Sequence, residues 1–590
     1  MCGINGFLSH RFDGEEVIRR MTISLRHRGP DGQKWVSPAP GVWFGHARLK
    51  VIDLSDEAAQ PMEAGGSWIV FNGEIYNYRK LRAELEQEGV TFRTQSDTEV
   101  ILAMYKKIGS GCVQRLDGMY AFAIWDGEKF FLARDFSGKK PLYYRITGEA
   151  FVFASEPKAI LEFAGAEPDK DQIPYGAVFG SPPDMCSWYQ GIEQLPPGSR
   201  ATYFPGDKSL RIERWWRYPR PGKIPIRPEQ RVRQLLTEAV AKRLVADVPL
   251  GVFLSGGIDS SIVVGLMRDI QPQGQIRTFA AKFVDDPRYD ESHFAEMVAE
   301  RYGTQHTTLP IRTPKDRLLE AVMERHDGPF GDSSAIPFHL LSREAKKHVT
   351  VALTGDGGDE VFGGYVRMRA CLWAEALPPW LHAAFFRNAG CPDPKRLVAR
   401  IRRFFGAASL PMPERLWRWI SLMEPGDFGK TWLELDPSLE ERWRESEGWP
   451  LENRILHMNF TQYLTEDLLP KGDRNSMAEG LEIRCPFLDR SLVEFAASLP
   501  GRIHFDWFRG KKLLRKACAD LLPPEILKRK KMGFGIPLRR DIHRQDQASL
   551  SLFLSPAGRE KAEKINPDSL AGFQLDQLNL FLEQRGVKPA

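Results

Sequence analysis

The sequence predicts a multidomain chain, with an α+β sandwich over residues 1–210 and a parallel-sheet α/β domain over residues 211–590. In the first part, short alternating segments such as "SWIVFNGEIYN" (67–77) are typical of antiparallel strands. In the second part, compact apolar segments such as "VPLGVFL" (248–254) alternate with helices, which favours a doubly wound parallel sheet. A stretch rich in Pro and Gly, residues 193–222, marks the boundary between the two patterns.

The other elements follow one of these two patterns. In the first part we predict strands in "GVWFGHARLKVIDLS" (41–55), "AFAIWDGEKFFLARD" (121–135) and "PLYYRITGEAFVFAS" (141–155), and helices in "RKLRAELEQEG" (79–89) and "DTEVILAMYKKIG" (97–109). In the second part, "IRTFAAKF" (276–283) and "HVTVALTG" (348–355) are predicted strands.

A helical addition is predicted from about residue 370 to residue 460, where the chain is rich in Trp and Arg. Basic and aromatic residues interleave in "RLVARIRRFFGAASL" (396–410) and "RLWRWISLM" (415–423). The pattern is found on faces that meet anionic polymers or membrane surfaces. Packed helices whose arginine stems cover apolar surface produce the same pattern, and we expect that explanation to hold here.

Composition places the chain among ordinary globular proteins. Its residues are 42% hydrophobic and 27% charged, and 82 basic against 77 acidic residues give a net charge of +5, too small to favour nucleic acid as a partner. Seven scattered cysteines without CxxC spacing argue against a disulfide framework or a zinc site and favour the reducing cytoplasm. We expect no signal peptide and no membrane span, because no apolar run is long enough.

The opening residues "MCGINGF" place a thiol at position 2. Removal of Met1 leaves Cys2 with a free α-amino group, so that one residue carries both a nucleophile and a nearby base. Hydrolases with an N-terminal nucleophile use this arrangement. The alternative is a buried, incidental cysteine beside a retained Met1.

A glycine-rich loop joins a strand to a helix in "GVFLSGGIDSSIVVGLM" (251–267). Two adjacent glycines let the backbone approach an anion closely, and the following helix directs N–H groups toward it. Asp259 inside the loop suits Mg²⁺ bound together with phosphate oxygens. We therefore predict a phosphate site, although a capped strand–helix turn gives a similar string.

A second loop of the same kind occurs in "HVTVALTGDGGDEVFGGY" (348–365). Loops at the carboxyl ends of parallel strands meet at one crevice. Asp259 and Asp359 are therefore predicted to share a metal ion there, against the alternative of a solvated acidic turn.

The chain resembles the glutamine-hydrolysing asparagine synthetases over nearly its full length, through a series of short strings in both parts. The strings of the first part are "MCGI", "HRGPDG" (27–32), "HARL" (46–49), "FNGEIYN" (71–77), "SDTE" (96–99) and "RD..GKKPLYY" (134–144). Those of the second are "SGGIDSS", "TGDGGDEVFGGY", "LEIRCPFLD" (481–489), "GKKLLRKA" (510–517) and "RKKMGFGIPL" (529–538). Their joint order is much more specific than any single string.

The resemblance implies that the first part is a class II glutamine amidotransferase domain with an N-terminal-nucleophile αββα sandwich. Cys2, freed of Met1, is implied to attack the side-chain amide of glutamine and release ammonia. The Asn72 side chain and the Gly73 N–H are implied to stabilise the oxyanion. The implied glutamine-binding residues are Arg48 for the carboxylate and Asp97 with Glu74 for the α-amine.

For the second part the resemblance implies an ATP-pyrophosphatase synthetase domain. There a carboxylate is adenylated by ATP, pyrophosphate leaves, and ammonia arriving through an internal channel displaces AMP. The residues implied for pyrophosphate are Ser255, Gly256, Gly257 and Ser260, and those implied for Mg²⁺ are Asp259 and Asp359. The residues implied to contact adenosine are Leu254, Ala281, Thr354 and Gly355, and Lys511 is implied to face the phosphates and the adenylate.

One position departs from the resembled pattern. Members that make asparagine usually read Ser-Gly-Glu-Gly in the second loop, whereas Asp356 stands here in Thr-Gly-Asp-Gly. Aspartate is shorter than glutamate by one methylene, which withdraws the carboxylate by about 1.5 Å, and a shift of this size in a catalytic site can lower the rate strongly. Aspartate is the expected acceptor, with a sugar acid or a biosynthetic intermediate as the alternative. The rival functions are a glutaminase with an inactive second part, a non-catalytic binding protein and a β-lactam-forming ring closure; a homodimer is compatible with all of these.

Overall fold

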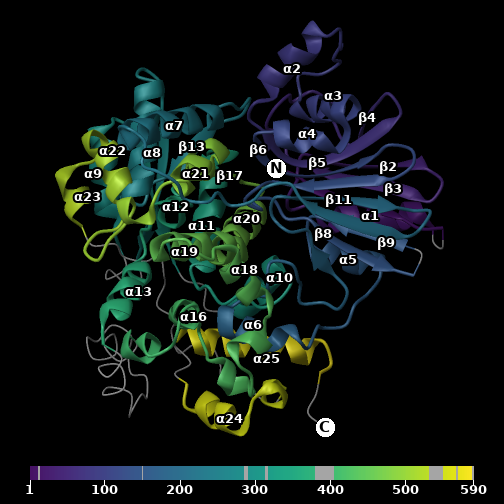
Figure 1. The fold of residues 1–590 in the computed structure, drawn as a ribbon. Coiled ribbons are helices and arrows are strands. Elements are labelled where there is room, and N and C mark those ends of the chain that lie inside the picture. The colour runs from purple at the N-terminus through teal and green to yellow at the C-terminus, as the bar shows by residue number, and fades with distance from the viewer. Residues whose placement is uncertain are drawn as a thin grey trace.

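The computed structural model describes residues 1–10, 13–148, 150–284, 290–312, 317–378, 404–529, 549–565 and 569–587. The string at 529–538, apart from its first residue, lies outside the described residues, as does residue range 379–403 of the expected helical addition. Figure 1 shows the sandwich of the first part beside the parallel-sheet part, with a helical region below the latter.

The first part is an αββα sandwich built from two six-stranded antiparallel sheets, as predicted. The order in one sheet is β10 (Glu193–Gln194), β8 (Tyr143–Thr147), β9 (Ala150–Ala154), β1 (Gly3–Leu8), β3 (Val42–Arg48) and β2 (Gly32–Ala39). The order in the other is β12 (Ser209–Arg214), β11 (Ser199–Phe204), β7 (Phe130–Arg134), β6 (Gly118–Trp125), β5 (Ser67–Ile75) and β4 (Met62–Ala64). The boundary expected at residue 210 falls within β12, which pairs along its whole length with β11.

Helices cover the outer faces of both sheets. Helices α1 (Gly14–Ser24) and α5 (Pro157–Phe163) pack on the first sheet, and α2 (Tyr78–Gln87) and α3 (Asp97–Ile108) lie over the second. Between the sheets, buried aromatic side chains such as Phe44, Phe130 and Phe153 contact one another edge to face. Strands such as β7 and β9 are buried along their whole length, because helices cover one face of each sheet and the other sheet covers the second face.

The second part contains a five-stranded parallel sheet, also as predicted. Its order is β15 (Gln305–Ile311), β14 (Arg277–Phe283), β13 (Leu250–Phe253), β16 (Val351–Leu353) and β17 (Glu482–Arg484). Its helices include α7 (Pro228–Arg243), α8 (Ile258–Ile270), α9 (Ser292–Arg301) and α11 (Ala335–Lys346). Strands β13 and β16 are neighbours, so the two glycine-rich loops that follow them lie side by side.

The described part of the helical addition is a packed set of helices. It includes helices α13 (Val366–Ala376), α16 (Glu414–Ile420), α18 (Ser438–Glu445) and α19 (Leu451–Met458). Trp417 and Trp419 of α16 and Trp443 of α18 are buried, Trp417 fully. Arg442 forms buried ion pairs with Asp184 (2.9 Å) and Glu466 (2.8 Å), and Arg454 lies over the Trp443 ring. Arg442 and Arg454 therefore contribute to the packing of this segment.

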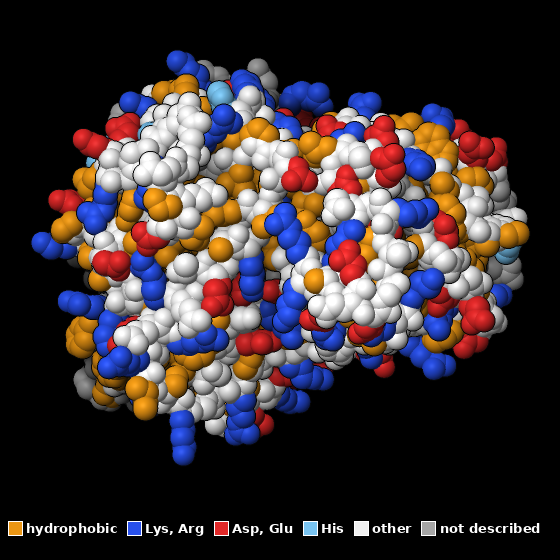
Figure 2. All heavy atoms as spheres, turned by 90° about the horizontal axis from the view of Figure 1, so that it is seen from above, with side chains coloured by type: hydrophobic (Ala, Val, Ile, Leu, Met, Phe, Trp, Pro, Cys, Tyr) orange, Lys and Arg blue, Asp and Glu red, His pale blue; other side chains and the backbone are white. Residues whose placement is uncertain are grey.

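Helix length, the state of the cysteines and the distribution of surface charge bear on the expectations from composition. Among the described residues, no helix combines the length and the apolar character that crossing a membrane requires. The six cysteines that lie in the described ranges are free thiols. Figure 2 shows basic and acidic side chains interspersed over the face that it presents.

Candidate functional site

The N-terminus is buried where the two parts meet. Met1 is 2% exposed and packs with Leu49 and Met119 of the first part and with Val351 and Met477 of the second. Cys2 precedes β1, and its thiol lies 3.8 Å from the Leu49 carbonyl oxygen. Burial raises the pKa of this thiol, and the positive charge of the N-terminal amine offsets part of that effect.

Asn72 on β5 is oriented by Cys2. The Cys2 N–H donates to Asn72 Oδ1 at 3.0 Å, whereas Asn72 Nδ2 is buried and makes no hydrogen bond among the described residues. A buried amide donor without a partner is costly unless a ligand uses it. Gly73 follows with φ +155°, and a Cβ there would lie 2.1 Å from the Met119 carbonyl oxygen, so only glycine fits.

The residues implied to bind glutamine surround this point. Arg48 ends β3 and donates to the carbonyl oxygens of Asp53 (2.7 Å) and Ser55 (2.8 Å), which fixes its planar fork. Asp97 starts α3 and accepts from the Ile75 N–H at 2.9 Å. Burial raises the pKa of Asp97 to about 6, which leaves it mostly ionised at pH 7.

The Met1 ammonium lies among carboxylates from both parts. It donates to Glu482 of β17 at 2.8 Å, and both groups are fully buried. Glu74 lies close to Glu482, and burial together with that like charge raises the pKa of Glu74 well above its ordinary value. Arg484, also on β17, partly offsets this from 3.4 Å. The Met1 ammonium therefore lies near Glu74, one of the two carboxylates expected to hold the glutamine amine.

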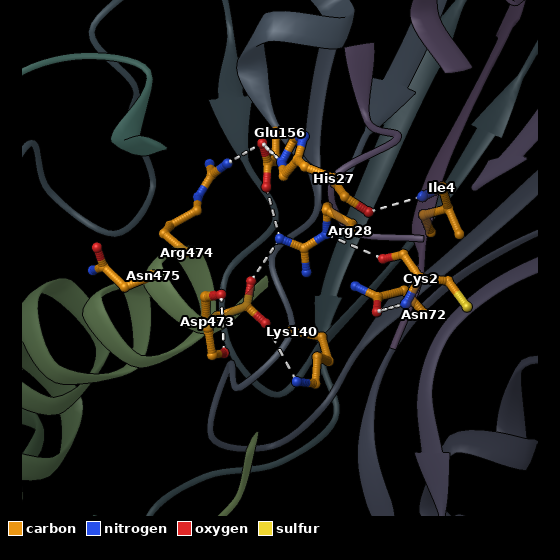
Figure 3. Close-up of polar contacts among 12 residues, drawn as sticks. Cys2, Ile4, His27, Arg28, Asn72, Lys140, Glu156, Asp473, Arg474 and Asn475 are labelled. Carbon is orange, nitrogen blue, oxygen red and sulfur yellow. Dashed lines mark hydrogen bonds and ion pairs between the residues drawn. The ribbon is translucent and has the colours of Figure 1, made fainter. Parts of the chain in front are cut away.

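A buried ion cluster supports Cys2 from the other side (Figure 3). Arg28, from the "HRGPDG" string, is fully buried and donates to the Cys2 carbonyl oxygen at 3.1 Å. The same guanidinium contacts Glu156 (2.7 Å) and Asp473 (2.8 Å), and Asp473 also pairs with Lys140 at 3.3 Å. Because Asp473 lies on α20 (Leu469–Met477), the cluster ties the nucleophile to the second part.

The second site is built around Lys511. Its ammonium lies 2.5 Å from Asp259 Oδ2 and 2.7 Å from Asp359 Oδ1, so the two glycine-rich loops converge on one cation. Despite burial, these carboxylates raise the pKa of Lys511 above its ordinary value. Two carboxylates this close also form a donor set that suits Mg²⁺ bound with phosphate oxygens.

Glycines make this convergence sterically possible. A Cβ on Gly358 would lie 2.6 Å from Asp259 Oδ1, and one on Gly364 would lie 1.7 Å from Asp359 Oδ1. Gly256 has φ +63° and packs against the backbone of Phe294. Beside it, the hydroxyls of Ser255 and Ser260 are 3.1 Å apart, and the Gly257 N–H donates to the Ser255 hydroxyl at 3.3 Å.

The remaining expected residues follow the carboxyl ends of the parallel strands. Leu254 directly follows β13 and donates to the Phe279 carbonyl oxygen at 2.8 Å, while Ala281 lies on β14. Thr354 and Gly355 follow β16, and the Thr354 hydroxyl donates to Asp356 Oδ2 at 2.8 Å. A Cβ on Gly355 would lie 2.8 Å from the Asp259 Cβ, so this loop abuts the first.

The structure thus brings the expected residues into two clusters, one at Cys2 and one at Lys511. Sequence reasoning missed Arg28, Glu482 and Asp473, whose partners lie hundreds of residues away along the chain. The strings "HRGPDG" and "LEIRCPFLD" contain Arg28 and Glu482 and were the only signal available for them. The first cluster can support attack by a thiol on a carbonyl, and the second can bind a polyphosphate with its metal ion.

The model of the asparagine synthase family matches residues 231–573, and the model of the glutamine amidotransferase domain matches residues 1–216. Asparagine synthetase [glutamine-hydrolyzing] 1 of Bacillus subtilis (strain 168) is 33% identical over 567 residues, covering 91% of this chain and 87% of that protein. Asparagine synthetase [glutamine-hydrolyzing] 3 of the same organism is 31% identical and covers 98% of this chain and 93% of its own. Amidase chry2 of Gibberella zeae is 28% identical and covers 90% and 88%.

Proposed function

The chain belongs to the asparagine synthase family and carries a glutamine amidotransferase domain, and we propose that this carbon–nitrogen ligase transfers ammonia from glutamine to a carboxylate activated by ATP. The observation that supports the coupling of the two reactions is the buried ion cluster at Arg28, which donates to the Cys2 carbonyl oxygen and pairs with Asp473 of α20. It joins the nucleophile of one half to a helix of the other half.

At the first site, removal of Met1 frees the Cys2 amine beside Asn72 Oδ1. The Cys2 amine takes the thiol proton and passes it to the leaving nitrogen; the thiolate bonds to the side-chain carbon of glutamine, and a thioester remains as ammonia leaves. Water then cleaves the thioester, which releases glutamate and restores the thiol. Asn72 Nδ2 and the Gly73 N–H are the proposed donors to the oxyanion. Arg48 holds the glutamine carboxylate. Asp97, which is mostly ionised at pH 7, is the proposed counter-ion for the glutamine α-amine, with Glu74 nearby.

At the second site, the carboxylate oxygen of the acceptor attacks the α-phosphorus of ATP and pyrophosphate leaves. Ser255, Gly256, Gly257 and Ser260 cradle that group with backbone and hydroxyl donors. Asp259 and Asp359 would hold Mg²⁺, which neutralises charge on the phosphates when it is bound. Lys511, fixed between these carboxylates, provides a second cation for the leaving group and the adenylate.

Aspartate is the acceptor that we propose, which makes the product asparagine, with AMP and pyrophosphate. The two Bacillus subtilis relatives named for that reaction support it. The second candidate is a different carboxylate served by the same chemistry. The shorter acid at Asp356 and the relative named an amidase favour that candidate.

A pyrophosphate-exchange assay tests the acceptor and the mechanism together. Purified protein is incubated with ATP, labelled pyrophosphate and one carboxylate from a panel of aspartate, sugar acids and larger acids. We expect label to enter ATP with aspartate, and the complete reaction with glutamine to release AMP without ADP. Exchange with another acid alone would exclude aspartate but retain the mechanism, and stoichiometric ADP would refute the mechanism.

A further inference from the structure

A cavity of about 420 Å³ lies where helix α5, helix α10 (Leu318–His326) and helix α25 (Leu570–Gln584) meet. Its volume falls within the range of about 300–1,000 Å³ that is usual for small-molecule sites. The residues assigned above to glutamine, to the nucleotide and to the metal ion do not line it. This cavity, called the α10–α25 cavity below, is therefore a candidate for a ligand other than the substrates.

Part of the lining is apolar. It comes from Leu161 of α5, Met323 of α10, Phe581 of α25 and Tyr189. The rings of Tyr189 and Phe581 pack edge to face, with their centroids 5.9 Å apart. An apolar group of a ligand would lose contact with water against these side chains, which favours binding by about 25 cal/mol for each Å² buried.

Most of the charged side chains that line the cavity already have a partner of opposite charge. Lys158 pairs with Asp327 at 3.4 Å, and Asp327 also pairs with Arg474 at 3.1 Å. Arg317 pairs with Glu324 at 3.6 Å. These groups neutralise one another and leave little charge for a ligand to satisfy.

Glu320 and Arg585 are different. Among the described residues, the Glu320 carboxylate forms no ion pair, and the Arg585 side chain contacts only Tyr189, to whose hydroxyl it donates at 2.8 Å. A carboxylate and a guanidinium that line one cavity without pairing suit a ligand that has both an ammonium and a carboxylate. An α-amino acid carries both groups on one carbon, and its side chain would meet the apolar part of the lining.

The cavity is joined to the nucleophile by a chain of ion pairs, the inner part of which is drawn in Figure 3. The Lys158 ammonium, whose side chain is 26% exposed, lies 3.2 Å from Glu156. Glu156 contacts Arg28 at 2.7 Å, and Arg28 donates to the Cys2 carbonyl oxygen at 3.1 Å. One carboxylate therefore separates a side chain of the cavity from the arginine that orients Cys2.

We propose that the α10–α25 cavity binds a free α-amino acid with an apolar side chain, and that the bound amino acid slows glutamine hydrolysis at Cys2. Its carboxylate pairs with Arg585 and its ammonium with Glu320. The ligand carboxylate also draws the Lys158 ammonium away from Glu156, and the change reaches Cys2 through Arg28. The binding site stands by itself, whereas its effect on Cys2 rests on the proposed function.

Calorimetric titration of the purified protein tests the site independently of activity. L-Leucine and L-phenylalanine should bind with a Kd of about 1 mM or below. N-Acetyl-L-leucine, which lacks the ammonium, and L-leucinamide, which lacks the carboxylate, should not bind. Glu320→Gln and Arg585→Met should each weaken binding at least about tenfold, because each leaves one charge of the ligand without a partner. Glu583→Gln is the matched control, since it removes a carboxylate of α25 that does not line the cavity.

Ammonia release at saturating glutamine tests the effect on Cys2. Saturating L-leucine should lower kcat about fivefold or more, the lower end of the usual coupling between sites, in wild type and in Glu583→Gln. It should have no effect in Glu320→Gln or Arg585→Met, whose kcat without leucine should stay near wild type. Lys158→Met should still bind leucine, but its kcat should not respond, because the contact with Glu156 is lost.

The possible failures can be told apart. Thermal unfolding midpoints near that of wild type would show that the variants are folded, so that a loss of binding reports on the site. No binding of leucine or phenylalanine to wild type, or equal binding to wild type and Glu320→Gln, would overturn the site. Binding with an unchanged kcat would overturn its effect on Cys2. A wild-type protein that binds leucine but releases no ammonia from glutamine would count against the proposed function and support the site.

Discussion

The Asn72 side chain has an acceptor oxygen and a donor nitrogen, and their contributions can be tested separately. Its Oδ1 accepts from the Cys2 N–H at 3.0 Å, and its buried Nδ2 is the proposed donor to the oxyanion. Asn72→Asp keeps an acceptor for the Cys2 N–H and replaces the donor by an oxygen of nearly the same size. Asn72→Ala removes both contacts.

The expected magnitude follows from the loss of one preorganised donor. Such a loss lowers kcat by about 10²–10³-fold, or about 2.7–4 kcal/mol of transition-state stabilisation. Asn72→Asp should lose at least this much, because a carboxylate also repels the developing negative charge. Asn72→Ala should lose a similar amount, with a further fall because Cys2 is no longer oriented.

The assay is glutamate release at saturating glutamine, with ammonium-dependent pyrophosphate release as the internal control. The control activity should stay near wild type in both variants, since the second site is separate. A kcat for Asn72→Asp within about tenfold of wild type would refute the assignment of Nδ2 as an oxyanion donor.

Three further outcomes are expected. Cys2→Ala should abolish glutaminase activity while ammonium-dependent amide formation survives; glutamine-supported product at the wild-type rate would contradict this. Asp259→Asn should reduce amide formation by at least about 100-fold, or about 2.7 kcal/mol, with glutaminase retained, and a smaller effect would argue against its role at the phosphates. Although burial opposes ionisation, Arg28 and Lys140 lower the pKa of Asp473 to about 2, so its stabilisation is complete above about pH 4 and is lost as the pH falls through 2. The lost contribution is about 2–3 kcal/mol, and the urea midpoint of Asp473→Asn should vary less than that of wild type between pH 5 and pH 2.

Local patterns were sufficient for most of the fold. The apolar segments at 250–253, 277–283 and 351–353 became the central strands because short continuous apolar runs between turn residues suit a sheet covered on both faces. Strand β17 was not predicted, because it begins and ends with charged residues, Glu482 and Arg484. Both are fully buried, and only their pairing with each other and with the first part allows this.

In the two sites as well, local patterns indicated some features, whereas others depend on residues far away in the chain. Glycine-rich loops can be recognised in the sequence because their backbone conformation requires glycine. Both loops lie at the carboxyl ends of the strands where they were expected. The roles of Arg28 and Asp473 depend on partners from the other half of the chain. Asp473, for example, is 333 positions from Lys140. No local pattern indicates which buried charge will neutralise which, so this part of the site could only be seen in three dimensions.

Strand β17 gives a physical reason why the two reactions occur in one chain. Glu482 at its start holds the N-terminal ammonium, and Arg484 at its end contacts Glu74 of the first site. The next residue, Cys485, contacts Thr354 in the second site. The strand is three residues long and pairs in register with β16, so the groups beside the nucleophile and the loop that carries Asp356 are fixed relative to one another.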